Sequence, residues 1–180
     1  MNDNSREKSE FLEWIFLIVL TLILAVLINT FIFSQTIVKG SSMEPTLKTN
    51  DRLLINKIGF LVDNIEYGDI VEFHNPYNKN DDNYIKRVIA LEGDIVEIIE
   101  NRVYVNQNLL TEEYTSTNGE TKIESEYYWE IKNDEVFVLG DNRPKSDDSR
   151  LFGPIKKDSI VGIAFFRFYP FNKFGNLNIN

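Results

Sequence analysis

The chain has 180 residues, a formal net charge of -9, one histidine and no cysteine. The lack of cysteine excludes disulfides, thiolate metal sites and a cysteine nucleophile, and a single histidine excludes two-histidine zinc sites and histidine-rich iron sites. An acidic chain repels phosphate backbones and anionic lipid headgroups, so we expect no nucleic-acid partner and only hydrophobic contact with a membrane.

A polar tail, residues 1–13, precedes a long apolar run from Trp14 to Phe33. This run has no charged residue, and a helix of its length spans about 30 Å, the thickness of a bilayer core. The alternatives are a buried soluble helix or a cleaved secretory signal, but the following FSQTIV lacks the small-x-small site of such a signal. We predict one transmembrane anchor. Basic residues flank it on both sides and leave its orientation open.

The rest of the chain is typical of β structure. Short runs rich in Val, Ile and aromatic residues are separated by turn residues, and Glu100-Asn101 is typical of a tight hairpin turn. The acidic stretch Leu110–Glu130 predicts a loop or an inserted subdomain. We therefore predict a mostly β fold. The predicted strands are Arg52–Asn56, Asp69–Phe73, Tyr84–Leu91, Asp94–Ile99, Arg102–Asn106 and Glu135–Gly140.

Two stretches carry candidate catalytic groups. The turn within Val38–Leu47 reads VKGSSMEPTL, although serines in such turns are more often turn formers than nucleophiles. In the strand YIKRVIAL, alternation sends Lys86 and Arg87 to opposite faces. Either one charged face meets solvent, or Lys86 lies in an apolar setting that lowers its pKa. In the second case the neutral amine can take a proton from a serine hydroxyl.

A third stretch, Gly140–Gly153, reads GDNRPKSDDSRLFG and is dense in turn and hydrogen-bonding residues. It fits a salt-bridged surface loop. A calcium loop is a weaker alternative, since the spacing of its acidic residues is not that of an EF-hand. His74 has no serine motif tied to it, and a G-x-S-x-G motif is missing. A serine with a lysine base needs neither a histidine nor a metal.

The chain resembles the bacterial type I signal peptidase family in four features that occur in the same order. They are the anchor, the motif S-M-x-P-T-L, a strand with K-R-V, and the motif G-D-N-R-x-x-S-x-D-S-R-x-F-G. The resemblance extends to Phe165–Gly175, and it is the ordered set that is specific, because no single motif is. It implies Ser42 as nucleophile and Lys86 as general base, with no metal and no cofactor. The implied fold is a curved antiparallel β barrel-like core with a β insertion at about residues 93–134, preceded by a single N-terminal transmembrane helix.

The resemblance also implies supporting roles. Ser146 matches the serine that orients the lysine amine, and Asp148 and Arg150 match a structural ion pair. Asp141 and Asn142 would shape the turn beneath the site, while Arg87 and Arg143 would be structural. The backbone N–H of Ser42 would hold the oxyanion. Some members add a hydroxyl two residues earlier, where this chain has Gly40, so that donor is missing.

Family substrates are secretory preproteins with small residues at −1 and −3 to the cut, bound as an added strand. By position, the −1 pocket would be lined by Val38, Met43, Leu47, Tyr84 and Ile85, and the −3 pocket by Thr36, Val38, Asn83 and Ile85. The family topology places residues 1–13 in the cytoplasm, the anchor 14–33 in the cell membrane and the peptidase domain 34–180 on the outer face. The expected partners are secretory preproteins and the lipid bilayer, and we expect a monomer.

Three other classes compete with this interpretation. A non-catalytic relative would be expected to lack the serine or the lysine, and both are present. A self-cleaving repressor shares serine–lysine chemistry, but it would need a basic DNA-binding segment. A sortase-type transpeptidase needs a cysteine.

Overall fold

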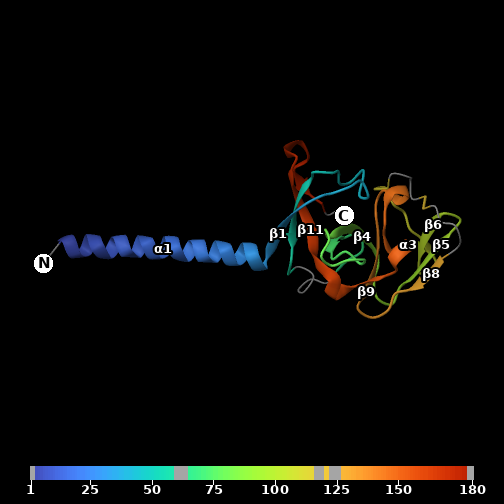
Figure 1. Cartoon of the computed structure of the whole chain (residues 1–180), viewed down its shortest axis with the longest axis horizontal. Helices are drawn as coiled ribbons and strands as arrows, with labels where there is room; N and C mark the ends of the chain where they lie inside the picture. Colours follow the sequence, from blue (N-terminus) through green and yellow to red (C-terminus); the bar gives the residue numbers. More distant parts are fainter. Residues whose placement is uncertain (1–2, 59–64, 116–119, 122–126, 178–180) are drawn as a thin grey trace.

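The computed structural model describes residues 3–58, 65–115, 120–121 and 127–177. A long helix, α1 (Asp3–Phe31), extends away from a β domain formed by the rest of the chain (Figure 1). No glycine or proline interrupts α1, and the Thr21 hydroxyl donates to the Leu17 carbonyl within the helix. The helix is therefore continuous, and the large apolar side chains that the structure describes between Phe11 and Leu27 are exposed.

Among the described residues, the window Glu10–Leu27 is the only helical segment long and apolar enough to cross a bilayer, and none of it is buried. The helix starts well before Trp14, so it includes most of the predicted polar tail. It also ends before Phe33, which begins strand β1 instead of closing the anchor as predicted. Pairing of this segment with β2 explains the difference, because the paired backbone is extended.

An antiparallel sheet curls around the centre of the β domain. Its strand order is β1-β2-β11-β3-β4-β9-β10, and β12 pairs with β11. Register shifts interrupt β11 at three places and β4 at one, and such bulges bend and twist a sheet. The strands are β1 (Phe33–Ile37), β2 (Arg52–Asn56), β3 (Ile70–Phe73), β4 (Tyr84–Ala90), β9 (Glu135–Leu139), β10 (Ile155–Lys156), β11 (Ile160–Tyr169) and β12 (Gly175–Asn176).

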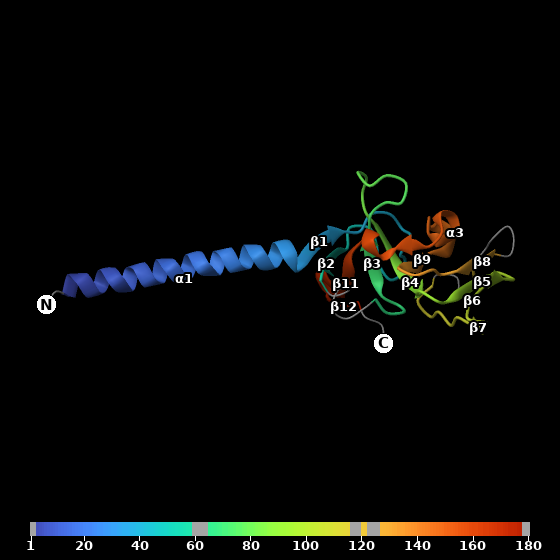
Figure 2. The same cartoon turned by 90° about the horizontal axis from the view of Figure 1, so that it is seen from below.

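A second antiparallel sheet, in the order β7-β6-β5-β8, lies at the end of the domain away from α1 (Figure 2). Glu100 and Asn101 have φ values of 50° and 63°, as a type I′ hairpin turn requires. These strands fall within residues 93–134, where we predicted an insertion. Residues 116–119 and 122–126 of that range lie outside the described part. The strands are β5 (Ile95–Ile99), β6 (Arg102–Val105), β7 (Asn108–Leu109) and β8 (Tyr127–Glu130).

The core is divided into three apolar clusters. One of them packs under the serine-bearing turn and includes Met43, Leu47 and Ile85. Another joins the two sheets, with Phe137 from β9 against Val96 and Ile98 from β5. The short helices lie on the surface of this framework and are η1 (Arg143–Lys145), α3 (Ser149–Phe152), η2 (Lys157–Ser159) and η3 (Phe171–Lys173).

The predicted mostly β class is confirmed, and each of the six predicted strands is present with its ends shifted by at most a residue or two. The strands β1, β7, β8, β10, β11 and β12 were not predicted, although β11 is the longest of the described strands. The strand β8 lies inside the stretch that was predicted as a loop or subdomain.

Candidate active site

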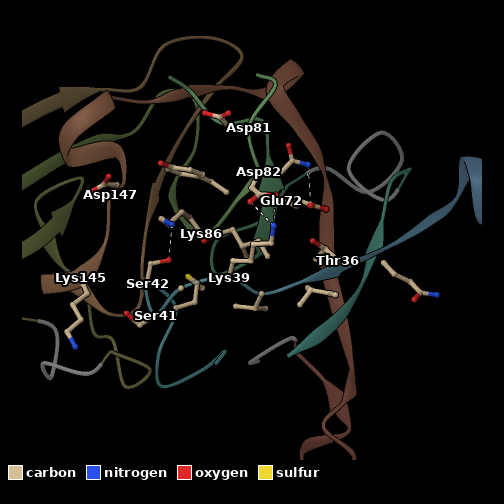
Figure 3. A pocket seen from close by; sticks show the side chains of 18 residues that line it. Thr36, Lys39, Ser41, Ser42, Glu72, Asp81, Asp82, Lys86, Lys145 and Asp147 are labelled. Carbon is tan, nitrogen blue, oxygen red and sulfur yellow. Dashed lines mark hydrogen bonds and ion pairs between the residues drawn. The ribbon is translucent and has the colours of Figure 1, made fainter. Parts of the chain in front are cut away.

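A cleft of about 820 Å³ lies between the segment that follows α1 and the start of β4. Residues 35–43 form one wall and residues 81–86 form the other, and Ser42 and Lys86 meet inside it (Figure 3). The walls are far apart in sequence but adjacent in the folded chain. The cleft therefore places a serine hydroxyl, a lysine amine and two strand edges in one depression.

The turn after β1 fixes the position of Ser42. Gly40 has φ of +81°, a left-handed conformation that glycine adopts without strain, and its carbonyl accepts a bond of 2.8 Å from the Thr49 hydroxyl. Directly after the serine, the fully buried Met43 and Leu47 anchor the turn in the core, and the Leu47 N–H donates to the Met43 carbonyl. Ser42 is thus held at the surface of the cleft by apolar groups beneath it.

Asn142, from the loop after β9, secures the same turn from the other side. Its backbone N–H donates to the Ser42 carbonyl and its side-chain amide donates to the Ser41 carbonyl, both at 3.0 Å. In the described structure the Ser42 N–H donates to no acceptor. The carbonyls of the turn are thus fixed while this N–H stays available, as an oxyanion donor requires.

Lys86 projects from β4 into the cleft, and its neighbour Arg87 projects to the opposite face. The Lys86 amine lies 3.0 Å from the Ser42 hydroxyl oxygen and donates to the Ile85 carbonyl at 3.2 Å. Only 4% of the Lys86 surface is exposed, and the ring of Tyr84 lies 5.0 Å from the amine. A strand with one charged face in solvent is therefore excluded, since both basic side chains are buried.

Burial lowers the pKa of Lys86 from 10.5 to about 8, because removing the ammonium from water disfavours its charged form. The carboxylates of Asp148, Asp147 and Asp141 oppose this shift, and Asp148 has the largest effect of the three. An amine with a pKa near 8 is neutral in an appreciable fraction of molecules at physiological pH. It can then accept a proton from the Ser42 hydroxyl at hydrogen-bond distance.

Asp141 pairs with Arg87. The carboxylate accepts two bonds from the guanidinium, of 2.9 and 2.8 Å, and both side chains are 1% exposed. A further nitrogen of Arg87 donates to the Gly68 carbonyl at 2.8 Å. Asp141 thus ties the loop that holds Ser42, through Asn142, to the strand that carries Lys86.

Asp148 and Arg150 form the predicted ion pair. The Arg150 guanidinium donates to the fully buried Asp148 carboxylate at 2.7 and 2.8 Å, and the Gly140 N–H donates to the same carboxylate at 3.1 Å. Arg150 also donates to the Arg143 and Ser146 carbonyls. The pair therefore connects the two ends of the loop from Gly140 to Arg150.

Ser146 does not make the predicted contact with the lysine amine. In the described part of the chain its hydroxyl is buried and without a hydrogen-bond partner. It lies against Gly140, where an added Cβ would collide with the Ser146 hydroxyl and come within 2.5 Å of the Ser42 carbonyl oxygen. Gly140 is therefore required for the close approach of the two serine-bearing segments.

A buried polar cluster behind the site was not predicted. Arg143 forms an ion pair with Glu112, and it donates to the Thr121 hydroxyl at 2.6 Å and to the Gly140 carbonyl at 3.1 Å. The Tyr114 hydroxyl donates to Glu112 at 2.8 Å, and its ring lies 4.0 Å from the Arg87 guanidinium. Arg143, which the resemblance marks as structural, was the available signal, because a buried arginine needs an acidic partner.

Most of the predicted subsite residues line the cleft. Leu47 does not, because it is fully buried in the core beneath the turn. The cleft also has charged residues that were not predicted, among them the buried Glu72 and an exposed ion pair of 2.7 Å between Lys39 and Asp82. The predicted residues that line it are Thr36, Val38, Met43, Asn83, Tyr84 and Ile85.

Within the described ranges, no group of three or more His, Asp or Glu side chains is arranged to hold a metal ion. Asp141 and Asp148, which the calcium alternative would have used, are instead paired with arginines. The loop from Gly140 to Gly153 is therefore a set of ion pairs that supports the serine and the lysine.

Comparison with known proteins identifies the family. Residues 11–169 match the family described as signal peptidase, peptidase S26. The chain is 39% identical over 183 residues to signal peptidase IB of Staphylococcus aureus, with 93% of this chain and 94% of that protein covered. It is 36% identical over 176 residues to signal peptidase I P of Bacillus subtilis subsp. natto, with the same coverage.

A crystal structure of a signal peptidase I from Enterococcus faecalis matches 55% of this chain and 95% of the other, with 31% identity and a TM-score of 0.47. The family match covers most of the chain, and the two relatives are aligned over nearly their full length. The chain therefore belongs to the bacterial type I signal peptidases, the S26 family of serine peptidases.

Proposed function

We propose that Ser42 and Lys86 form the catalytic dyad with which this signal peptidase removes signal peptides from secreted preproteins. The observation that carries the proposal is the 3.0 Å contact between the Ser42 hydroxyl and the buried Lys86 amine. Lysine is the only base in contact with this serine among the described residues, and its lowered pKa fits the task.

The neutral Lys86 amine takes the proton of Ser42 as the serine oxygen attacks the scissile carbonyl carbon. The resulting oxyanion accepts a bond from the Ser42 N–H. The lysine ammonium then returns its proton to the amine of the departing mature protein, which leaves an ester between Ser42 and the signal peptide. The same lysine takes a proton from a water molecule that attacks this ester, and proton transfer back to Ser42 restores the enzyme.

The loop from Gly140 to Arg150 supports the dyad. Asn142 holds the turn of Ser42, the Asp148–Arg150 pair holds the loop, and Asp141 joins it to Arg87 on the lysine strand. The Ser146 hydroxyl is the spare hydrogen-bonding group next to Gly140. We assign it to orient the amine when a substrate occupies the cleft.

The preprotein binds as an extended strand between the two walls of the cleft. Backbone bonds to strand edges hold it, and the apolar Val38, Met43 and Ile85 leave room only for small side chains at −1 and −3. Because the side chains of an extended peptide alternate, the −1 and −3 residues point into the same wall. This alternation accounts for a requirement for small side chains at −1 and −3 and not at −2.

In the proposed topology, α1 crosses the cell membrane once, with the N-terminus in the cytoplasm and the peptidase domain on the outer face. The exposed apolar surface of α1 supports contact with the bilayer. Strand β1 follows α1 directly and leads into the turn of Ser42, so the anchor holds the cleft near the membrane. We propose that the enzyme acts as a monomer, since one chain supplies both members of the dyad.

The test uses the purified full-length chain in detergent and a preprotein with alanine at −1 and −3. We expect Ser42→Ala to lower kcat at least about 10³-fold, because the loss of a nucleophile cannot be compensated by the remaining groups. Lys86→Ala should have an effect of similar size. Ser41→Ala is the matched control and should retain most of the activity, since its hydroxyl makes no contact with Lys86.

Turnover by the Ser42→Ala variant at a rate near that of the unmodified enzyme would refute the dyad. A non-catalytic relative is the competing function. A penem inhibitor separates the two, since it should acylate Ser42 in a peptidase and add its mass to the peptide that contains this residue. A preparation that neither cleaves the preprotein nor becomes acylated would favour the non-catalytic alternative.

A further inference from the structure

One buried carboxylate in the cleft has no role in the catalytic steps. Glu72, on β3, is only 6% exposed, yet it lines the cleft. One of its oxygens accepts a bond of 3.3 Å from the Asn83 amide. In the described part of the chain no basic residue forms an ion pair with it, and its second oxygen has no hydrogen-bond donor.

The second oxygen is not among the buried side-chain atoms that lack a partner, so it is open to the cleft that Glu72 lines. A carboxylate with most of its surface buried and one oxygen open to a cleft is a hydrogen-bond acceptor for whatever enters that cleft. Position 72 faces Ile85 across the β3–β4 pair and Gly162 across the β3–β11 pair, so an aliphatic residue would suit the sheet equally well. The carboxylate therefore points to a ligand that enters the cleft.

The neighbours of Glu72 identify where that ligand lies. Ile85, its cross-strand partner, and Asn83, its hydrogen-bond donor, are both assigned to the −3 subsite. Thr36 belongs to the same subsite, and Figure 3 shows Glu72 and Thr36 on the side of the cleft away from Ser42. The carboxylate thus borders the place where the −3 side chain would lie.

A chain of hydrogen bonds also determines which groups near Glu72 donate and which accept. Nδ1 of His74 lies 3.1 Å from the Asn83 carbonyl oxygen, which can only accept. The amide nitrogen of Asn83 is thereby directed at Glu72. Glu72 in turn is an acceptor, and its free oxygen is available to a donor from the substrate.

We infer that Glu72 is a specificity-determining residue that makes the −3 subsite select small side chains with a hydroxyl donor, serine and threonine, over aliphatic side chains of equal size. The inference rests on the proposed function for the location of the −3 subsite. A threonine hydroxyl donates to the free carboxylate oxygen in a charge-assisted bond. Valine has the same shape but covers the carboxylate without a bond and leaves it unsatisfied.

The test compares two peptides that differ only at −3, threonine in one and valine in the other, with alanine at −1 in both. We expect the full-length enzyme in detergent to cleave the threonine peptide with a kcat/KM about tenfold higher, the effect of one hydrogen bond to a charged group. Glu72→Val should abolish or reverse this ratio, and Glu72→Gln should reduce it. Glu97→Val, a strand glutamate of the second sheet outside the cleft, should leave it unchanged.

Equal or better cleavage of the valine peptide by the unmodified enzyme would overturn the inference and leave the dyad intact. A preference for threonine that survives in both Glu72 variants would also overturn it. If neither peptide is cleaved and the alanine-containing preprotein is also left intact, the proposed function fails instead. If Glu72→Val does not fold, the test rests on Glu72→Gln, which keeps the shape of the side chain. The deciding quantity is then its ratio of kcat/KM values for the threonine and valine peptides.

Discussion

At the scale of single residues, the proposed mechanism depends on the proton affinity of Lys86. With a pKa of about 8, roughly a tenth of the molecules carry the neutral amine at pH 7. We therefore expect kcat/KM for a peptide substrate to rise about tenfold per pH unit below pH 8 and to level off above it. The measurement is a pH profile of the full-length enzyme in detergent. A rate that is constant from about pH 6 to pH 10 would contradict a lysine base.

The same residue reduces the stability of the fold. The pKa of Lys86 is 10.5 in an unfolded chain and about 8 in the folded one, so between these values the unfolded chain binds more protons. Stability then rises with pH through this window and is lowest below pH 8, where the cost is about 3 kcal/mol. We expect Lys86→Met to raise the free energy of unfolding at pH 7 by about 1–3 kcal/mol, with the gain lost toward pH 10.5.

Denaturant unfolding of the two proteins at pH 7 and pH 10 measures this difference. The matched control is Lys79→Met, a change at an exposed lysine that should have little effect at either pH. A variant that is no more stable than the unmodified chain at pH 7 would mean that the Lys86 amine is well solvated in the folded protein. In that case the low pKa on which the proposed mechanism depends would also be wrong.

The order of the motifs and the family that they resemble were enough to predict that Ser42 and Lys86 lie together, and their side chains are 3.0 Å apart; their catalytic roles remain a prediction. The motifs and the family were not enough for Glu112, Tyr114 and Glu72, because none of these belongs to a motif and each acquires its setting from strands that are distant in sequence. A contact between the Ser146 hydroxyl and the Lys86 amine was also predicted, but the structure does not contain it. A resemblance specifies which residues are near one another, whereas the direction of a hydroxyl depends on local packing.

At the scale of elements, strands with clear alternation between turn residues were predictable, and those without it were not. The strand β11 contains a run of aromatic residues and three register shifts, and its buried and partly buried residues stop alternating in the second half of the strand. The strand β1 is separated from α1 by Ile32 alone and has mostly polar residues, and its conformation comes from pairing with β2. Such strands are defined by their partners more than by their own sequence.

The segment around Glu112 and Tyr114 links the region of the second sheet to the loop behind Ser42. We expect Glu112→Gln to lower the free energy of unfolding by about 3–5 kcal/mol, because it leaves the buried Arg143 without its counter-charge. Replacing both residues, as in Glu112→Leu with Arg143→Met, should recover a large part of the loss. Guanidinium unfolding followed by the fluorescence of Trp129, which packs against Phe137, measures these effects.

Glu92→Gln provides the matched control, since Glu92 is in a more exposed ion pair with Lys157, and we expect its unfolding midpoint to stay unchanged. Equal midpoints for Glu112→Gln and the unmodified chain would show that the buried pair contributes no net stabilisation. A double variant less stable than Glu112→Gln would indicate that Arg143 acts through its bonds to Thr121 and Gly140 instead.

At the scale of the whole molecule, the proposed topology suits a substrate that is itself held in the membrane. The turn of Ser42 follows α1 after one short strand, so a membrane-spanning α1 would keep the cleft close to the membrane surface. A signal peptide crosses the bilayer with its N-terminus inside, and its cleavage region emerges on the outer face. Confinement of enzyme and substrate to one membrane raises their effective concentration, which compensates for shallow subsites.

This arrangement requires the β domain to lie outside the cell, which the charges around α1 do not determine. The absence of cysteine makes a direct test possible, since a single introduced thiol is the only one to react. In cells that express Asn108→Cys, at an exposed position in β7, we expect labelling by a membrane-impermeant maleimide without lysis. In Ser9→Cys, in the N-terminal part of α1, the label should react only after lysis. The reverse labelling pattern would show that the chain has the opposite orientation in the membrane. Labelling of both thiols in intact cells would exclude a single crossing, since each end of α1 would then lie outside.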